Sequence, residues 1–123
     1  MNNLTPDAIE KLQNSKNIWF GSVRPDGRPH LTPVWFVFWQ DHLFVSIDPK
    51  SIKRKNITQN PNVVLALEEG NHPVICEGRA KPIQPPYAEE MLALFQQKYD
   101  WDINGEAQYN VVVEVLPQKW LVW

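Results

Sequence analysis

The chain has 123 residues, of which 12 are Lys or Arg and 14 are Asp or Glu, so its formal net charge is −2 with neutral histidines. This balance excludes a generally basic nucleic-acid-binding protein. Hydrophobic residues make up 43% of the chain and charged residues 21%, which is typical of an ordinary globular domain. We therefore expect one domain over residues 1–123, without a nucleic-acid partner.

Targeting signals and cysteine content limit the cellular compartments that we expect for the protein. The first residues lack the basic and apolar regions of a signal peptide, and the longest apolar run, residues 34–39, is too short to span a membrane. The single cysteine, Cys76, cannot form an intrachain disulfide and fits a reducing compartment. We expect a cytoplasmic protein with no membrane association.

Apolar periodicity and turn residues predict a succession of short elements, without repeats or linkers. Thr5 and Pro6 are residue types of a helix N-cap and first turn. Gly27 suits a hairpin turn, and Gly78 inside a strand indicates a bulge. In chain order we predict a helix from Pro6 to about residues 14–17, strands over 18–23, 30–39 and 43–47, a helix within 49–60, strands over 63–67 and 74–83, a helix from 87, and strands over 109–116 and 120–123.

The strands and their short connections define the fold class. Connections of this length exclude repeated βαβ crossovers, so we predict a mostly antiparallel β-barrel with short rim helices, in the mainly β or α+β class. Within residues 34–39, Trp35 and Val37 alternate with Val34 and Phe36, which makes both strand faces apolar. A helix, a flat aromatic ligand or a second copy of the chain must cover the outer face, and we favour a homodimer.

One apolar stripe is helical in its spacing. Tyr87, Met91, Phe95 and Tyr99 recur every four residues, as they would along one face of a helix. We interpret this stripe as a surface that packs on the core.

A basic run lies at the start of the second predicted helix. Residues 50–55 read Lys-Ser-Ile-Lys-Arg-Lys, and cations are unfavourable at the positive end of a helix unless an anion binds there. Free backbone N–H groups, the Ser51 hydroxyl and the Lys53 ammonium are together suited to a phosphate. The alternative is a solvated basic face that serves solubility.

Residues for acid–base or metal chemistry do not form a recognisable motif. His30, His42 and His72 lack the spacing of metal ligands, and Cys76 is expected to be a small buried side chain. The sequence also lacks a phosphate-binding glycine loop and a Gly-x-Ser-x-Gly nucleophile motif. We infer a protein that takes its reactivity from a cofactor.

Several segments, in their order and spacing, resemble the pyridoxamine 5′-phosphate oxidase-like family of FMN-binding split β-barrels. The resemblance covers the chain from about residue 17 and rests on residues 23–36, 43–47, 51–57, 60–63, 77–80 and 117–123. It implies a six-stranded antiparallel split barrel that forms a homodimer, with FMN at the subunit interface.

The resemblance also implies positions for the cofactor. Family members hold the edge of the flavin ring along the second strand and the ribityl phosphate between the third strand and the next helix. These regions map onto Thr32, Pro33, Val34 and Trp35 for the ring, and onto Ser46, Ile47, Ser51 and Lys53 for the phosphate, with Lys50 or Lys55 assisting. The C-terminal segment of the second subunit, with Trp120 and Trp123, is expected to approach the flavin.

The implied function is hydride transfer between FMN and a small organic substrate. Thr32 and Val37 stand where a true pyridoxamine 5′-phosphate oxidase has Arg and Lys, so we do not expect oxidation of that vitamer. Two alternatives stay open on the same barrel. One is a reductase that uses a deazaflavin, and the other is a non-catalytic carrier or sensor of flavin or haem.

Overall fold

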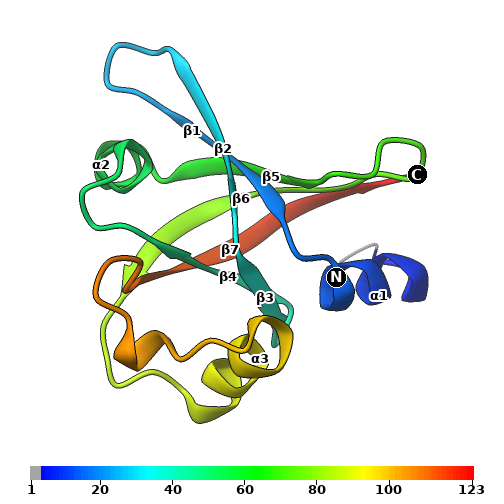
Figure 1. The fold of residues 1–123 in the computed structure, drawn as a ribbon. Coiled ribbons are helices and arrows are strands. Elements are labelled where there is room, and N and C mark those ends of the chain that lie inside the picture. Colours follow the sequence, from blue (N-terminus) through cyan, green and yellow to red (C-terminus); the bar gives the residue numbers. More distant parts are fainter. Residues whose placement is uncertain (1–3) are drawn as a thin grey trace.

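The structure, a computed structural model, describes residues 4–123, so residues 1–3 of the expected domain lie outside it. A single antiparallel sheet curls around a core, and three helices lie at its rim (Figure 1). Among the described residues, no helix has the length and apolarity needed to cross a membrane. The elements are α1 (Pro6–Asn14), β1 (Ile18–Val23), β2 (Pro29–Val34), β3 (Phe36–Trp39), β4 (His42–Ile47), α2 (Ile52–Gln59), β5 (Asn62–Leu67), β6 (Val74–Ile83), α3 (Glu89–Tyr99), the 3₁₀ turn η1 (Ile103–Gly105) and β7 (Val111–Val122).

The strand order makes the sheet a split barrel. The seven strands follow the order β2-β1-β5-β6-β7-β4-β3, so β2 and β3 lie at opposite edges although they are consecutive in the chain. The sheet must curl to bring these edges together, and Ser46 N donates to the carbonyl of Trp35 where they meet. The antiparallel barrel predicted from the sequence is confirmed, with seven strands rather than the six that the family resemblance implied.

Two strand predictions are wrong in detail. The strand predicted over residues 30–39 is broken at Trp35 into β2 and β3, because its two halves pair with different neighbours, β1 and β4. The two strands predicted at the C-terminus are one strand, β7, which passes through Pro117. A register shift at Glu77/Gly78 of β6 lies beside Pro117, and such a bulge accommodates a residue that has no N–H to donate.

The predicted caps and turns are confirmed. Thr5 Oγ1 accepts a hydrogen bond from Ala8 N at the start of α1, at 3.1 Å. Gly27 adopts φ +90° in the β1–β2 turn, a conformation that glycine reaches without strain. The irregularity predicted at Gly78 is a register shift whose extra residue, Gln118, belongs to β7. Gly78 itself lies close to the β7 backbone, where a Cβ would come within 2.7 Å of the Leu116 carbonyl oxygen.

A second core forms on the outside of the barrel. Met91 and Phe95 of α3 are buried against Val37 of β3 and Phe44 of β4, which confirms the predicted packing stripe. Of the three covers that the sequence allowed for the outer face, a helix covers the region of Val37 (Figure 1). This region therefore needs no second copy of the chain, and the homodimer stays a prediction.

Candidate functional site

The candidate site is a cavity of about 560 Å³ at the junction of β2 and β3. Strand ends, the α2 helix and the segment between α3 and β7 all contribute to its wall. A pocket of this size, mostly apolar with a few polar groups, is typical of a small-molecule or cofactor site. Its lining residues are Asn17, Pro33, Val34, Trp35, Ser46, Ile47, Lys53, Trp101, Glu106 and Tyr109.

Six residues expected to hold a cofactor line this cavity, although they come from two parts of the chain. They are Pro33, Val34, Trp35, Ser46, Ile47 and Lys53. The closure of the barrel brings the end of β2 beside the end of β4, so strand pairing rather than sequence proximity assembles the group. Ser46 is also fixed in place, because its hydroxyl donates to the carbonyl of Tyr109.

Thr32 lies on β2 immediately before the cavity-lining Pro33. Among the described residues, its hydroxyl oxygen and Asn56 Oδ1 are the buried side-chain polar atoms that lack a hydrogen-bond partner. An unpaired buried hydroxyl costs free energy unless something else supplies a partner. Thr32 is next to a lining residue in the chain but does not itself line the cavity.

Lys53 is the one lysine or arginine in the lining. Burial lowers the pKa of its ammonium, and the nearby carboxylate of Asp48 partly opposes this shift. No described residue forms an ion pair with Lys53, whose side chain lines a largely apolar cavity. An anionic ligand would stabilise the charged form of this side chain.

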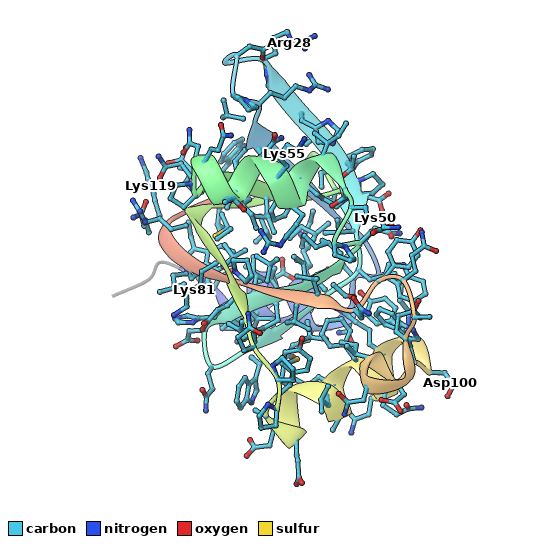
Figure 2. The ribbon with its side chains drawn as sticks, turned by 90° about the vertical axis from the view of Figure 1, so that its left-hand side faces the viewer. Arg28, Lys50, Lys55, Lys81, Asp100 and Lys119 are labelled. Atoms are coloured by element: carbon cyan, nitrogen blue, oxygen red, sulfur yellow. The ribbon has the colours of Figure 1, made fainter. Side chains whose placement is uncertain are left out.

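Three other expected residues lie near the cavity but do not line it. Ser51 caps α2, and its Oγ accepts from Arg54 N at 3.3 Å, a bond that leaves its O–H able to donate to an anion. Lys50 N donates to the Asp48 carboxylate at 2.8 Å, while its side chain is exposed. Figure 2 places Lys50 and Lys55 on the outer surface around α2, in keeping with the solvated basic face that was the alternative interpretation.

The C-terminal tryptophans lie elsewhere in this chain. Trp120 is buried in the barrel core against Phe38, so within one chain it is not open to the cavity, and its expected approach to a flavin of a second subunit stays a prediction. Trp123 is 69% exposed and lies beside α1, in a separate groove with Thr5. A contact between Trp123 and the cavity would need a second subunit, and it stays a prediction.

The backbone at the cavity edge is held by Tyr99, the last residue of α3. Its hydroxyl accepts from Phe36 N at 2.9 Å and lies within hydrogen-bond distance of the carbonyls of Phe36 and Lys16, at 2.9 and 2.8 Å. Burial raises the pKa of Tyr99 to about 12, so the phenol keeps its proton as a donor. Its ring stacks on Trp35, with centroids 4.4 Å apart and planes 8° from parallel. Tyr99 thus fixes both the strand break and the orientation of Trp35.

Lys98, the residue before Tyr99, also binds the backbone at Phe36. Its Nζ donates to the carbonyls of Leu12 and Phe36 at 3.2 and 3.1 Å and lies 3.8 Å from the centroid of the Phe36 ring. Burial, with a smaller effect from Lys16, lowers the pKa of this ammonium to about 7. The end of α3 therefore joins α1 and β3 beside the cavity.

Sequence reasoning missed the wall formed between α3 and β7. Trp101, Glu106 and Tyr109 come from this segment, and Asn17 from the approach to β1. The segment has no strand or helix periodicity that would place it in space, and Asp100 ends α3 in a left-handed conformation that re-aims the chain. The available signal was two aromatic residues and a carboxylate in a polar loop, where binding residues often occur.

Metal and thiol chemistry find no support in the described part of the chain. No group of three or more His, Cys, Asp or Glu side chains there could hold a metal ion. Burial raises the pKa of Cys76 to about 12, so its thiol is neither a nucleophile nor a ligand at neutral pH. His42 lies 2.7 Å from the carboxylate of Glu114, away from the cavity.

The curled seven-stranded sheet, with a ligand-sized cavity where its edges meet, defines the class of split β-barrel proteins. The profile of the family described as pyridoxamine 5′-phosphate oxidase matches residues 4–123, and the chain belongs to this family. No curated protein matches the chain significantly.

Solved structures show the same fold at low identity. The heme storage protein HutZ from Vibrio cholerae is 22% identical, with a TM-score of 0.81 over 99% of this chain and 95% of that chain. An F420 reductase is 23% identical, with a TM-score of 0.73 over 95% and 98% of the two chains. HupZ from Group A Streptococcus is 16% identical, with a TM-score of 0.74 over 97% and 94%. These names cover haem and deazaflavin proteins, so the fold alone does not select the cofactor.

Proposed function

We propose that this protein binds FMN in the cavity and transfers a hydride between the flavin and a small organic substrate. The observation that carries the proposal is Lys53, a half-buried ammonium that faces a largely apolar cavity without an ion-pair partner in the described chain. A phosphate is a ligand that would compensate this charge, and the end of β4 and the start of α2 lie beside it. Bound FMN would supply the hydride chemistry, which this chain's own residues lack.

The residues present fit an FMN phosphate and ring. Lys53 offers a cation to the phosphate, and Ser46 and Ile47 line the cavity at the end of β4. Backbone groups of Pro33 and Val34 line the wall, where peptide C=O groups can hold the polar edge of a flat ring.

We also propose a homodimer with the cofactor at its interface. Trp19, Leu31 and Val64 form an exposed apolar face on β1, β2 and β5, because Gly21 lies opposite both Leu31 and Val64 in the sheet. This face adjoins the cavity, since Trp19 pairs with the cavity-lining Pro33. A second copy of the chain placed here would cover both the apolar surface and the open side of the site.

The cavity wall favours a flavin over haem. Haem iron in proteins is held by His, Cys, Met or Tyr side chains, and of these types only Tyr109 is found among the described lining residues. A carrier or sensor role and a deazaflavin cofactor are alternatives that the experiments below separate from the proposal.

Binding is tested by titrating FMN and riboflavin into wild type, Lys53→Ala and Lys55→Ala. Lys55 is the matched control, because it is an exposed lysine of the same helix. A charge-assisted contact of about 1.5–3 kcal/mol predicts that Lys53→Ala weakens FMN binding about 10- to 100-fold, with little change for riboflavin. Lys55→Ala should bind FMN as wild type does.

The proposal fails if wild type shows no saturable FMN binding, or if the two variants lose FMN equally. Tighter binding of the deazaflavin F420 than of FMN would identify the cofactor as a deazaflavin. Loaded protein is then mixed with NADH or NADPH under anaerobic conditions, and flavin absorbance is followed. Reduction no faster than that of free FMN would favour the carrier or sensor role.

A further inference from the structure

The segment between α3 and β7 gives the cavity a second charged feature, distinct from Lys53. Glu106 lines the cavity with Trp101 and Tyr109, and it forms no ion pair with Lys53 or with any other described residue. Two opposite charges therefore face one cavity without neutralising each other. A cavity of this kind suits an anionic group at one point and a cationic group at another.

The Glu106 carboxylate is held in one orientation by neutral donors. Trp101 Nε1 donates to one oxygen at 2.9 Å, and the backbone N–H groups of Gln108 and Tyr109 donate to the other at 3.0 and 3.2 Å. These hydrogen bonds lower the pKa of Glu106, so it stays ionised well below neutral pH. Neutral donors orient the carboxylate but leave its full negative charge available to a ligand.

Aromatic faces surround this carboxylate. Trp35 is 45% exposed, with one face stacked on Tyr99 and with Trp101 edge-on at 5.5 Å, so part of its ring is open to the cavity. Tyr109 is 48% exposed in the same wall. The faces of Trp and Tyr rings carry negative electrostatic potential and attract cations, and their flat surfaces stack on flat rings.

We propose that this wall, formed by Trp35, Trp101, Tyr109 and Glu106, selects a flat heterocycle with a positive charge as the substrate. A pyridinium or a protonated amino-heterocycle would stack on the tryptophans and place its charge near the Glu106 carboxylate. The proposal rests on the proposed function for its catalytic meaning, because it names the substrate class of the same cavity. The binding preference itself needs no flavin.

The test compares two probes that differ in charge and little else. 1-Methylnicotinamide is a flat cation, and nicotinamide is its neutral counterpart. Binding of each to wild type, Glu106→Gln and Glu89→Gln is measured by calorimetry, with and without saturating FMN. Glu89→Gln is the matched control, because it removes an exposed carboxylate of α3, outside the cavity.

Wild type and Glu89→Gln should bind the cation about fivefold more tightly than the neutral ring, and Glu106→Gln should bind both equally. Equal binding of both probes by wild type, or a preference that survives in Glu106→Gln, would overturn the proposal. If Glu106→Gln does not fold, wild type is measured from about 20 mM to about 0.5 M salt. The cation preference should then fall with salt, and a preference independent of salt would contradict the electrostatic origin.

The outcomes separate this inference from the proposed function. A cation preference in a protein that does not bind FMN supports the wall and refutes the flavin function. FMN binding with equal affinity for the two probes supports the flavin function and refutes the proposed selectivity of the wall.

Discussion

Two regions of the barrel's outer face have similar apolar residues but differ in what covers them. On β3 and β4, Val37 and Phe44 are buried beneath α3. On β1, β2 and β5, Leu31 is 59% exposed and Val64 also faces solvent. An apolar outer face in a small barrel therefore indicates that something covers it, but not whether the covering element belongs to the same chain. Here the chain's own helix covers one region, and in our proposal a second subunit covers the other.

The covered face should respond strongly to truncation. Phe95 of α3 is fully buried, so Phe95→Ala should lower the free energy of unfolding by about 3–5 kcal/mol through lost burial and a cavity. Leu31→Ala, the matched change on the open face, should cost less than about 1 kcal/mol in the isolated protomer. Urea denaturation at low protein concentration measures both, and equal costs would refute the contrast.

The long β6–β7 pair lies between the two regions in the sheet, and its register shifts at Glu77/Gly78. A methyl group at this position would lie 2.7 Å from the Leu116 carbonyl oxygen and 3.0 Å from Val115 Cγ1. Gly78→Ala should therefore cost about 1–3 kcal/mol, because backbone cannot move aside as a flexible side chain can. Gly70→Ala is the control, since a methyl group there would meet no atom within 4 Å and the variant should fold as wild type does.

Tyr99 connects the covered face to the cavity. Tyr99→Phe keeps the stacking on Trp35 but leaves Phe36 N without its described acceptor, which should cost about 1–3 kcal/mol. Tyr87→Phe removes a longer hydroxyl contact with the Asn110 carbonyl, 3.3 Å at an exposed site, and should cost less than about 0.5 kcal/mol. Thermal unfolding compares the two variants. A Tyr99→Phe protein as stable as wild type would show that the break between β2 and β3 does not depend on the Tyr99 hydroxyl.

The open face should matter for assembly rather than for folding. Leu31→Glu places a charge in the proposed interface, so it should convert a dimer to a monomer while changing protomer stability by less than about 0.5 kcal/mol. Light scattering after size-exclusion chromatography reports the mass. A monomeric wild type would remove the proposed second subunit, and a dimeric Leu31→Glu would move the interface elsewhere.

The last prediction concerns the pH dependence of stability that Lys98, at the end of α3, introduces. Lys98 has a pKa of about 7 when folded and an ordinary value near 10.5 when unfolded, so between these values the unfolded state binds the additional proton. Stability should therefore rise from pH 7 to about 9, above which the raised pKa values of Cys76 and Tyr99 act in the opposite direction. Urea midpoints measure this rise, and Lys98→Met should flatten it. An equal rise in that variant would assign the effect to other groups.

The sequence predicted the helices, strands and turns better than it predicted which strands pair with each other. The cap at Thr5, the hairpin turn at Gly27 and the irregularity at Gly78 depend on local backbone geometry, which residue type strongly constrains. The break at Trp35 was missed because residues on both sides favour strands equally. Only the pairing of each half with a different neighbour separates them.

In the candidate site, too, some residues could be predicted from the sequence and others could not. Lys53 was found because cations at a helix start are unusual enough to indicate a ligand. Trp101 and Glu106 were missed because their place depends on how a loop without periodicity returns from α3 to β7. Family resemblance supplied the β2 residues, whose side chains carry little signal when backbone groups do the binding.

The position of β7 in the sheet also orders events during synthesis. This strand is the last in the chain, yet it lies between β6 and β4 and pairs with both. Until residues 111–122 have emerged from the ribosome, the β3–β4 hairpin lacks the strand, β7, through which it pairs with the rest of the described sheet. A ligand of this cavity therefore meets a complete site only after translation has passed β7, which makes binding a late event in the maturation of the protein.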